Sequence, residues 1–184
     1  MRVQVSPEQV RQAFAKVSDD PSFAESRALA AQGRMPAEMI QALTLRPEIL
    51  RGFAGFGAGV YPGGLLERRV KELVIIESSR RNSCQFCTQS HLALVRMLGM
   101  IDEPFAALDD LGALAPRERL AVEYTRAAMT DSNRVPDALF EQLRAHFTDA
   151  EIVELTFLIG YINMLNLFNN CLQVRYADDY ATLR

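Results

Sequence analysis

The stretch Ser83-Cys84-Gln85-Phe86-Cys87-Thr88-Gln89-Ser90-His91 contains two of the chain's three cysteines and one of its two histidines. An α-helix turns about 100° per residue. Offsets of three and then four positions therefore place Cys84, Cys87 and His91 on one helical face, stacked over two turns. The imidazole then lies one turn beyond Cys87, where it can accept the thiol proton. The spacing predicts a helix that presents a dithiol and a base together.

The expected limits of this helix bear on the chemistry of its first cysteine. Asn82 or Ser83 is the predicted N-cap, and Gly99 is predicted to end the helix after Leu98. Cys84 would then lie in the first turn, where unpaired N–H groups and the helix dipole favour an anion. That position predicts a lowered pKa for the Cys84 thiol.

Other interpretations of the motif remain open. A cysteine is often a small buried hydrophobic residue, and a histidine is often a hydrogen-bonded core or surface residue. A zinc site needs four protein ligands, or three with one open position. The chain has neither a second CxxC nor a second clustered histidine, so a carboxylate would have to complete such a site. A redox-active dithiol is the favoured interpretation.

The composition predicts one globular domain. The chain has 184 residues, of which 49% are apolar and 23% charged, with a net charge of −3. We expect a single domain over residues 1–184, with its core at about 36–172. The charge gives no basic footprint, so nucleic acid is not an expected partner.

A cytoplasmic location is expected. No apolar segment of the secretory type follows the N-terminal residues 1–6. Three cysteines do not make a secreted disulfide framework, and CxxC in a reducing compartment indicates catalysis or metal binding. The most apolar run, 156–172, is interrupted by four asparagines and is expected to be too polar for a membrane span: Asn163, Asn166, Asn169 and Asn170.

Almost every segment has a helical pattern, so the predicted fold class is all-α. Prolines and capping residues mark most of the helix starts. The predicted helices cover about 7–17, 20–33, 36–45, 47–56, 65–80, 84–98, 104–111, 116–131, 136–146 and 149–171. Residues 176–180 are expected to form a tail or a short arm.

Glu72 is the unusual member of the apolar helix predicted at 65–80. On a helical wheel it falls among Leu65, Ile75, Ile76 and Ser79, and an unpaired carboxylate in such a row is costly. One interpretation is a structural carboxylate paired with Arg68 or Arg69. The other is a functional group of the dithiol site.

Three further features are left without an assigned role. Asn163, Asn166 and Asn170 share one face of the last helix, and they could line the active-site pocket, form a subunit interface or face water. Cys171 and His146 belong to no motif. Both are expected to be spectators.

Together, Glu72, Cys84, Cys87 and His91 form an E-x11-C-x2-C-x3-H arrangement. This arrangement resembles the alkylhydroperoxidase D branch of the carboxymuconolactone decarboxylase superfamily. The resemblance implies an AhpD-like all-α fold, a homo-oligomer (commonly a trimer or hexamer) and hydroperoxide reduction through a Cys84–Cys87 disulfide cycle. It further implies a proton relay of Glu72 and His91, and an external dithiol, thioredoxin-like or lipoyl-type reductant. No cofactor beyond the redox-active disulfide is expected.

One position departs from the family pattern. The best-known members have a histidine directly before the second cysteine, where this chain has Phe86. A weaker or different peroxidase activity is therefore an alternative. The decarboxylases of the superfamily generally lack the cysteine pair, so decarboxylation is disfavoured. A redox sensor without turnover and a zinc-binding structural protein are the competing hypotheses.

Overall fold

The computed structural model describes residues 1–178, and the regular structure in this range is helical. The helices are α1 Pro7–Phe14, α2 Ala24–Ala31, α3 Glu38–Leu43, α4 Pro47–Gly59, α5 Arg68–Arg81, α6 Gln85–Met97, α7 Pro104–Asp109, α8 Pro116–Thr130, α9 Asp137–His146 and α10 Asp149–Leu172, with 3₁₀ turns η1 Pro21–Phe23 and η2 Leu111–Ala113. The all-α prediction is confirmed. Of the predicted tail, Asp179 and Tyr180 lie outside the described residues.

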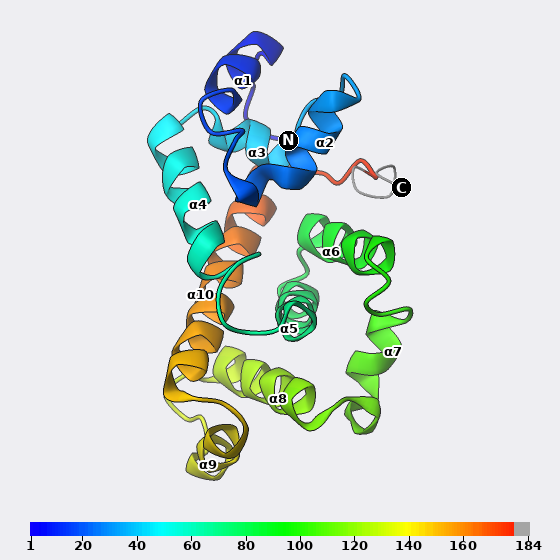
Figure 1. The fold of residues 1–184 in the computed structure, drawn as a ribbon, viewed down its shortest axis with the longest axis vertical. Coiled ribbons are helices and arrows are strands. Elements are labelled where there is room, and N and C mark those ends of the chain that lie inside the picture. The colour runs from blue at the N-terminus through cyan, green and yellow to red at the C-terminus, as the bar shows by residue number, and fades with distance from the viewer. Residues whose placement is uncertain (179–184) are drawn as a thin grey trace.

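Helix α5 is the centre of the molecule. Figure 1 shows it nearly end on, with α6, α7, α8 and α10 around it. Every residue from Val70 to Ser79 is buried, which explains why this helix has apolar side chains on more than one side. The prediction of a largely buried helix before the dithiol is confirmed.

Buried charges on α5 are paired with its neighbours. Lys71 Nζ lies 2.7 Å from Glu154 Oε1 of α10, and Arg126 Nε of α8 donates to Glu77 Oε1 at 2.8 Å. Breaking such a buried pair would leave an uncompensated charge, so these contacts fix how α8 and α10 pack on α5.

The start of α5 differs from the prediction by three residues. The helix begins at Arg68, because the backbone N–H groups of Leu65 and Leu66 donate to the Glu154 carboxylate instead of lying within the helix. A distant side chain thus determines where this helix begins. By contrast, the predicted capping box at Thr148 and Glu151 is present at the start of α10.

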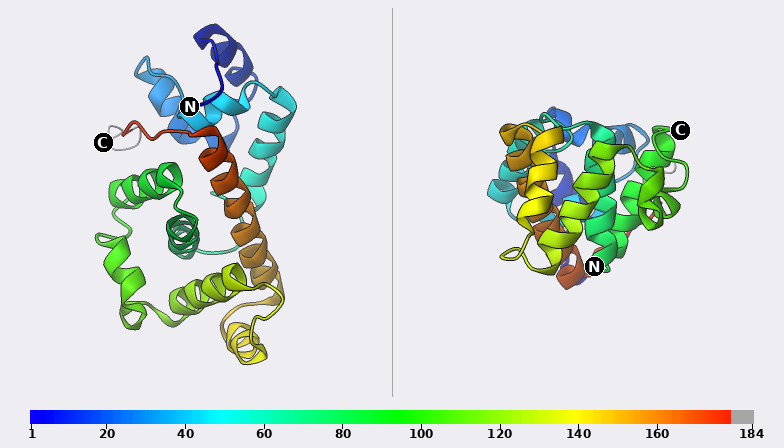
Figure 2. Two further views of the ribbon diagram at one scale, coloured as in Figure 1. Left: turned by 180° about the vertical axis from the view of Figure 1, so that it is seen from behind. Right: turned by 90° about the horizontal axis from the view of Figure 1, so that it is seen from below.

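The N-terminal helices gather at one end of α10, as the view from behind in Figure 2 shows. Phe14, Phe23 and Leu50 belong to their shared apolar cluster. Ser22 of η1 packs so closely on α4 that a Cβ at Gly57 would lie 1.6 Å from Ser22 Oγ. Glycine at this position therefore allows η1 to approach α4.

Of the helices described, one is long and apolar enough to span a membrane by length and composition. It is α10, with a mean hydropathy of 1.3 in its most apolar window. Its asparagines thus do not make it too polar for this criterion, contrary to our expectation. Half of that window is buried within the protein, as in a core helix.

Candidate active site

The turn between α5 and α6 places the two cysteines at the start of α6. Cys84, not Asn82 or Ser83, is the N-cap, which corrects the prediction. Ser83 has a φ of 52°, in the left-handed region, whereas an N-cap needs an extended backbone. Asn82 instead ends α5. Cys84 therefore caps the helix with its sulfur and does not lie within the first turn.

The two sulfur atoms are close and buried. Cys84 Sγ and Cys87 Sγ are 2.9 Å apart, and the backbone N–H of Cys87 donates to Cys84 Sγ at 3.4 Å. Both cysteines are free thiols, since a disulfide bond is about 2.05 Å long. They need only a small approach to form one.

Because the two sulfurs are close together, the pKa values of Cys84 and Cys87 shift in opposite directions. The hydrogen bond from Cys87 lowers the pKa of Cys84 to about 7, against the effect of burial. The hydrogen bond with Cys84, together with burial, raises the pKa of Cys87 above its usual range. Cys84 is therefore the more acidic of the two thiols, and Cys87 keeps its proton to higher pH.

Glu72 and His91 are brought together across the α5–α6 pair. His91 Nδ1 lies 2.7 Å from Glu72 Oε2, and Arg68 Nε donates to Glu72 Oε1 at 2.6 Å. Burial alone would raise the pKa of Glu72, but the opposite charges and hydrogen bonds of His91 and Arg68 lower it. The carboxylate is thus paired with Arg68, as the structural interpretation of Glu72 predicts, and it also contacts the imidazole beside the dithiol.

Tyr61 is a member of this network that the sequence did not reveal. Its hydroxyl donates to Glu72 Oε1 at 2.8 Å, accepts from Arg68 at 2.7 Å and lies 3.4 Å from His91 Nδ1. Burial and the charge of Glu72 raise the pKa of Tyr61 well above its usual value. The only signal in the sequence is the turn at 61–64, which says nothing about the direction of the side chain.

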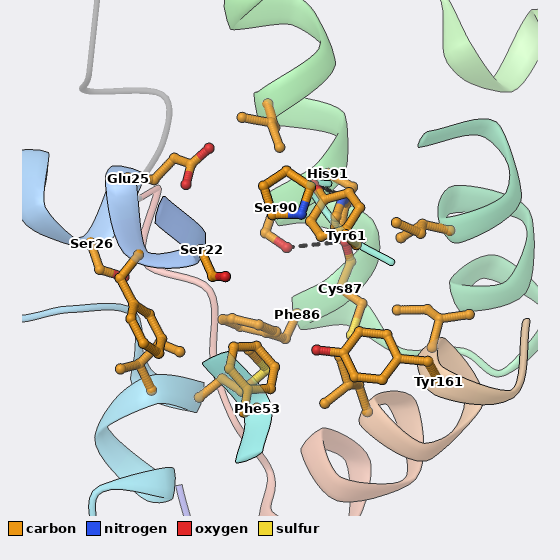
Figure 3. Close-up of a pocket in the computed structure, with 18 of the residues that line it drawn as sticks. Ser22, Glu25, Ser26, Phe53, Tyr61, Phe86, Cys87, Ser90, His91 and Tyr161 are labelled. Carbon is orange, nitrogen blue, oxygen red and sulfur yellow. Dashed lines mark hydrogen bonds between the residues drawn. The ribbon is translucent and has the colours of Figure 1, made fainter. Parts of the chain in front are cut away.

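A cavity of about 100 Å³ opens beside Cys87 and His91. Figure 3 shows Tyr61, Ser90 and His91 on one side of it and the η1–α2 residues Ser22 and Ser26 on the other. Its walls are mainly apolar and include four aromatic rings: Phe23, Phe53, Phe86 and Tyr161. An apolar cavity of this size admits a small organic molecule.

The cavity distinguishes the two sulfurs. Cys87 lines it and Cys84 does not. Within residues 1–178, no hydrogen bond joins His91 to either sulfur, although the helical spacing predicted that the imidazole could accept the Cys87 thiol proton. Phe86, between the two cysteines in the sequence, adds an apolar wall.

The remaining candidates lie apart from this cavity. Cys171 is exposed near the end of α10 and is not bonded to either motif cysteine. His146 ends α9, where its carbonyl accepts from Arg117. No group of three potential metal ligands gathers among the described residues.

The site combines a dithiol at a helix start, a carboxylate–imidazole pair and an adjoining cavity in an all-α fold. These features define the class of AhpD-like dithiol proteins. Residues 47–127 match the model of the carboxymuconolactone decarboxylase family. An uncharacterized protein, YdfG of Bacillus subtilis (strain 168), is 30% identical over 117 residues, which cover 61% of this chain and 80% of that protein. The chain belongs to the carboxymuconolactone decarboxylase family, in its AhpD-like branch.

Three solved structures have the same fold. An AhpD-core, peroxidase-related protein from Ralstonia eutropha JMP134 has a TM-score of 0.75 and 23% identity, covering 98% of this chain and 94% of its own. A putative antioxidant defence protein AhpD from Agrobacterium tumefaciens has a TM-score of 0.65 and 28% identity, covering 76% and 97%. The debrominase Bmp8 has a TM-score of 0.73 and 18% identity, covering 100% and 96%. The fold is thus shared by a debrominase and by proteins described as peroxidase-related or AhpD-like.

Proposed function

We propose that this protein is a thiol-dependent reductase of organic hydroperoxides. The observation that carries the proposal is that Cys87 lines an apolar cavity with His91 while Cys84 lies directly behind it, 2.9 Å away. A substrate in the cavity can reach one sulfur, and the other sulfur can then complete a disulfide.

In the proposed cycle, the Cys87 thiolate attacks the terminal oxygen of the hydroperoxide. An S–O bond forms, the O–O bond breaks, and the leaving alkoxide takes a proton through His91 to become an alcohol. The Cys84 thiolate then attacks the sulfur of the Cys87 sulfenic acid. An S–S bond forms, the S–O bond breaks, and the leaving hydroxide takes a proton from solvent through His91 to become water. An external dithiol of thioredoxin or lipoyl type reduces the disulfide by exchange, at the cost of its own oxidation.

Accessibility and acidity favour different sulfurs as the first nucleophile. The lowered pKa belongs to Cys84, but Cys84 does not line the cavity. We assign the first attack to Cys87, because a thiolate that the peroxide cannot touch does not react with it. A more acidic Cys84 suits the second step, in which it must be a thiolate to attack the sulfenic acid.

Glu72 acts through His91 in this proposal. The carboxylate holds Nδ1, and the other ring nitrogen, Nε2, is left for proton transfer within the cavity. Arg68 and Tyr61 keep Glu72 charged and oriented, since both bond its Oε1. The relay is thus a nucleophile–base–orienter site.

The test is turnover of tert-butyl hydroperoxide with a panel of dithiol donors. We expect multiple turnovers for the wild type, a loss of more than about a hundredfold for Cys87→Ser, and one oxidation without recycling for Cys84→Ser. Cys171→Ser is the matched control and should retain full activity. A single oxidation of the wild type with every donor would instead indicate a redox sensor.

The aromatic walls also favour a second candidate reaction, removal of bromine from a brominated pyrrole. The likeness to Bmp8, whose structure with 2,3,4-tribromopyrrole is known, supports including it. Here Cys87 would take the bromine, the ring carbon would gain a proton, and Cys84 would displace bromide to give the same disulfide. Bromide release from this pyrrole under the same donors tests it.

We also propose that the protein is a homo-oligomer, a trimer or hexamer, working in the reducing cytoplasm. An oxidised Cys84–Cys87 pair is recycled only where a reduced dithiol pool is available.

A further inference from the structure

Four asparagines of α10 lie near the dithiol, and three of them hold the turn before it. Asn82 Nδ2 donates to Asn163 Oδ1 at 2.6 Å and to Asn166 Oδ1 at 2.9 Å. Asn170 Nδ2 donates to the Asn82 carbonyl at 3.0 Å. These bonds fasten the α5–α6 turn to α10 and so place Cys84. They account for the asparagine stripe seen in the sequence.

Asn169 is bonded differently. It is 1% exposed, and its Nδ2 lies 3.2 Å from Cys87 Sγ and 3.4 Å from Met39 Sδ. Its Oδ1 is buried without a partner in the described part of the chain. A neutral thiol and a thioether are weak acceptors, so this amide is poorly satisfied while Cys87 is protonated. A buried amide with such partners needs an explanation other than stability.

We infer that Asn169 is a catalytic residue whose amide N–H stabilises the Cys87 thiolate. A thiolate is a charged acceptor, so the same N–H···S contact becomes much stronger when Cys87 loses its proton. Asn169 transfers no proton itself. The inference rests on the proposed function in one respect only, that Cys87 is the sulfur that attacks.

The surroundings of Cys87 show why a donor is needed there. Cys84 Sγ accepts the backbone N–H of Cys87 and lies 2.9 Å from Cys87 Sγ, whereas Cys87 receives no direct bond from His91. The bond with Cys84 and burial both raise the pKa of Cys87, and the amides of Asn169 and, to a smaller extent, Asn166 lower it. Asn169 is therefore an uncharged hydrogen-bond donor to Cys87. It stabilises the thiolate of the sulfur that lines the cavity but is the less acidic of the two.

The test measures iodoacetamide labelling of Cys87 against pH in a Cys84→Ser background, with each cysteine quantified by mass spectrometry. Asn169→Leu removes the donor at nearly constant volume, and Asn169→Asp replaces it with a negative charge. We expect labelling at pH 7 to fall about tenfold for Asn169→Leu and further for Asn169→Asp. The rates should converge with the wild type at high pH, where the thiol ionises unaided.

Asn163→Leu is the matched control, because Asn82 keeps its second acceptor, Asn166. Its labelling profile should follow the wild type. Circular dichroism identifies folded variants, and one folded Asn169 variant is sufficient. Labelling equal to the control, or slowed equally at every pH, would overturn the inference. Failure of the wild type to turn over peroxide would sink the proposed function and leave this labelling result standing.

Discussion

Glu72 is fully buried, yet its pKa is held below the usual value, because His91 and Arg68 oppose the effect of burial. In the proposed function Glu72 acts on the dithiol through His91, because His91 lines the cavity and Glu72 does not. Substitutions of Glu72 and His91 should therefore affect one step and not two independent steps.

We expect His91→Ala to slow labelling of Cys87 near neutral pH much more than at high pH. Glu72→Gln should give a smaller defect in the same direction, and the double variant should be little worse than His91→Ala. Glu77→Gln is the matched control, because Glu77 is an equally buried carboxylate of α5 that pairs with Arg80 and Arg126 instead. Defects that simply multiply would mean that the two groups act separately.

For single residues, the sequence predicted some of the side-chain contacts in the site and missed others, and the reason is physical. Helical spacing is enough to place Cys87 and His91 on one face, because helical geometry is regular. The pairing of Glu72 with His91 was predicted only from the family resemblance. The direction of Tyr61 depends on a loop, and that of Asn169 on how α10 is rotated against α6. Sequence spacing fixes neither angle, so Asn163, Asn166 and Asn170 stood out while the residue at the sulfur did not.

Among the helix ends, the start of α10 is held by the strongest surface network. The Glu151 carboxylate accepts hydrogen bonds from the Arg117 guanidinium and from the backbone N–H of Thr148. These bonds lower the pKa of Glu151 to about 2. Because the folded pKa is depressed from 4.5, this stabilisation is present at neutral pH. It is lost as the pH falls from about 4.5 through 2.

Glu151→Gln should therefore lower the free energy of unfolding at pH 7 by about 1–2 kcal/mol, allowing for solvent screening. The difference from the wild type should shrink on acidification below pH ~4.5 and vanish near pH ~2. Glu141→Gln removes an exposed pair with Arg144 and should change stability by less than about 0.5 kcal/mol. Urea unfolding at a series of pH values measures both, and a pH-independent Glu151→Gln defect would contradict the linkage.

Helix ends set by local chemistry were predictable, and those set by distant groups were not. Prolines and the Thr148 capping box mark starts that the structure reproduces, because their bonds lie within four residues. The start of α5 depends on Glu154, more than eighty residues away. The N-cap of α6 depends on the left-handed turn at Ser83.

For the whole molecule, the cavity is the feature least visible in the sequence. Its walls come from η1, α2, α3, α4, α5, α6 and α10, so no single stretch encodes it. The dithiol motif locates the chemistry, whereas the N-terminal helices outside the family-matched residues 47–127 close the space over it.

Residues 1–178 leave an apolar surface on α10 uncovered. Val153, Phe157, Met164 and Leu167 of α10 are 67%, 46%, 51% and 66% exposed, and they follow one another at spacings of four, seven and three residues along one stripe. Phe56 of α4 extends it, with its ring centroid 5.5 Å from that of Phe157. An apolar stripe of this length favours burial against another helix. In the proposed homo-oligomer, a second copy of the chain covers it.

Replacing both Val153 and Leu167 with Glu should therefore convert the oligomer to a species near the 20.6 kDa chain mass. Two charges in an interface core cannot be buried without partners, whereas on a free surface they are harmless. Light scattering at about 10 μM, well above the nanomolar to micromolar range of stable complexes, gives the mass. Leu98→Glu is the matched control, since Leu98 is an exposed leucine of α6 outside the stripe. A monomer mass for the wild type would contradict the proposed oligomer. If the wild type co-sediments with lipid vesicles and the double variant does not, the stripe binds a membrane instead.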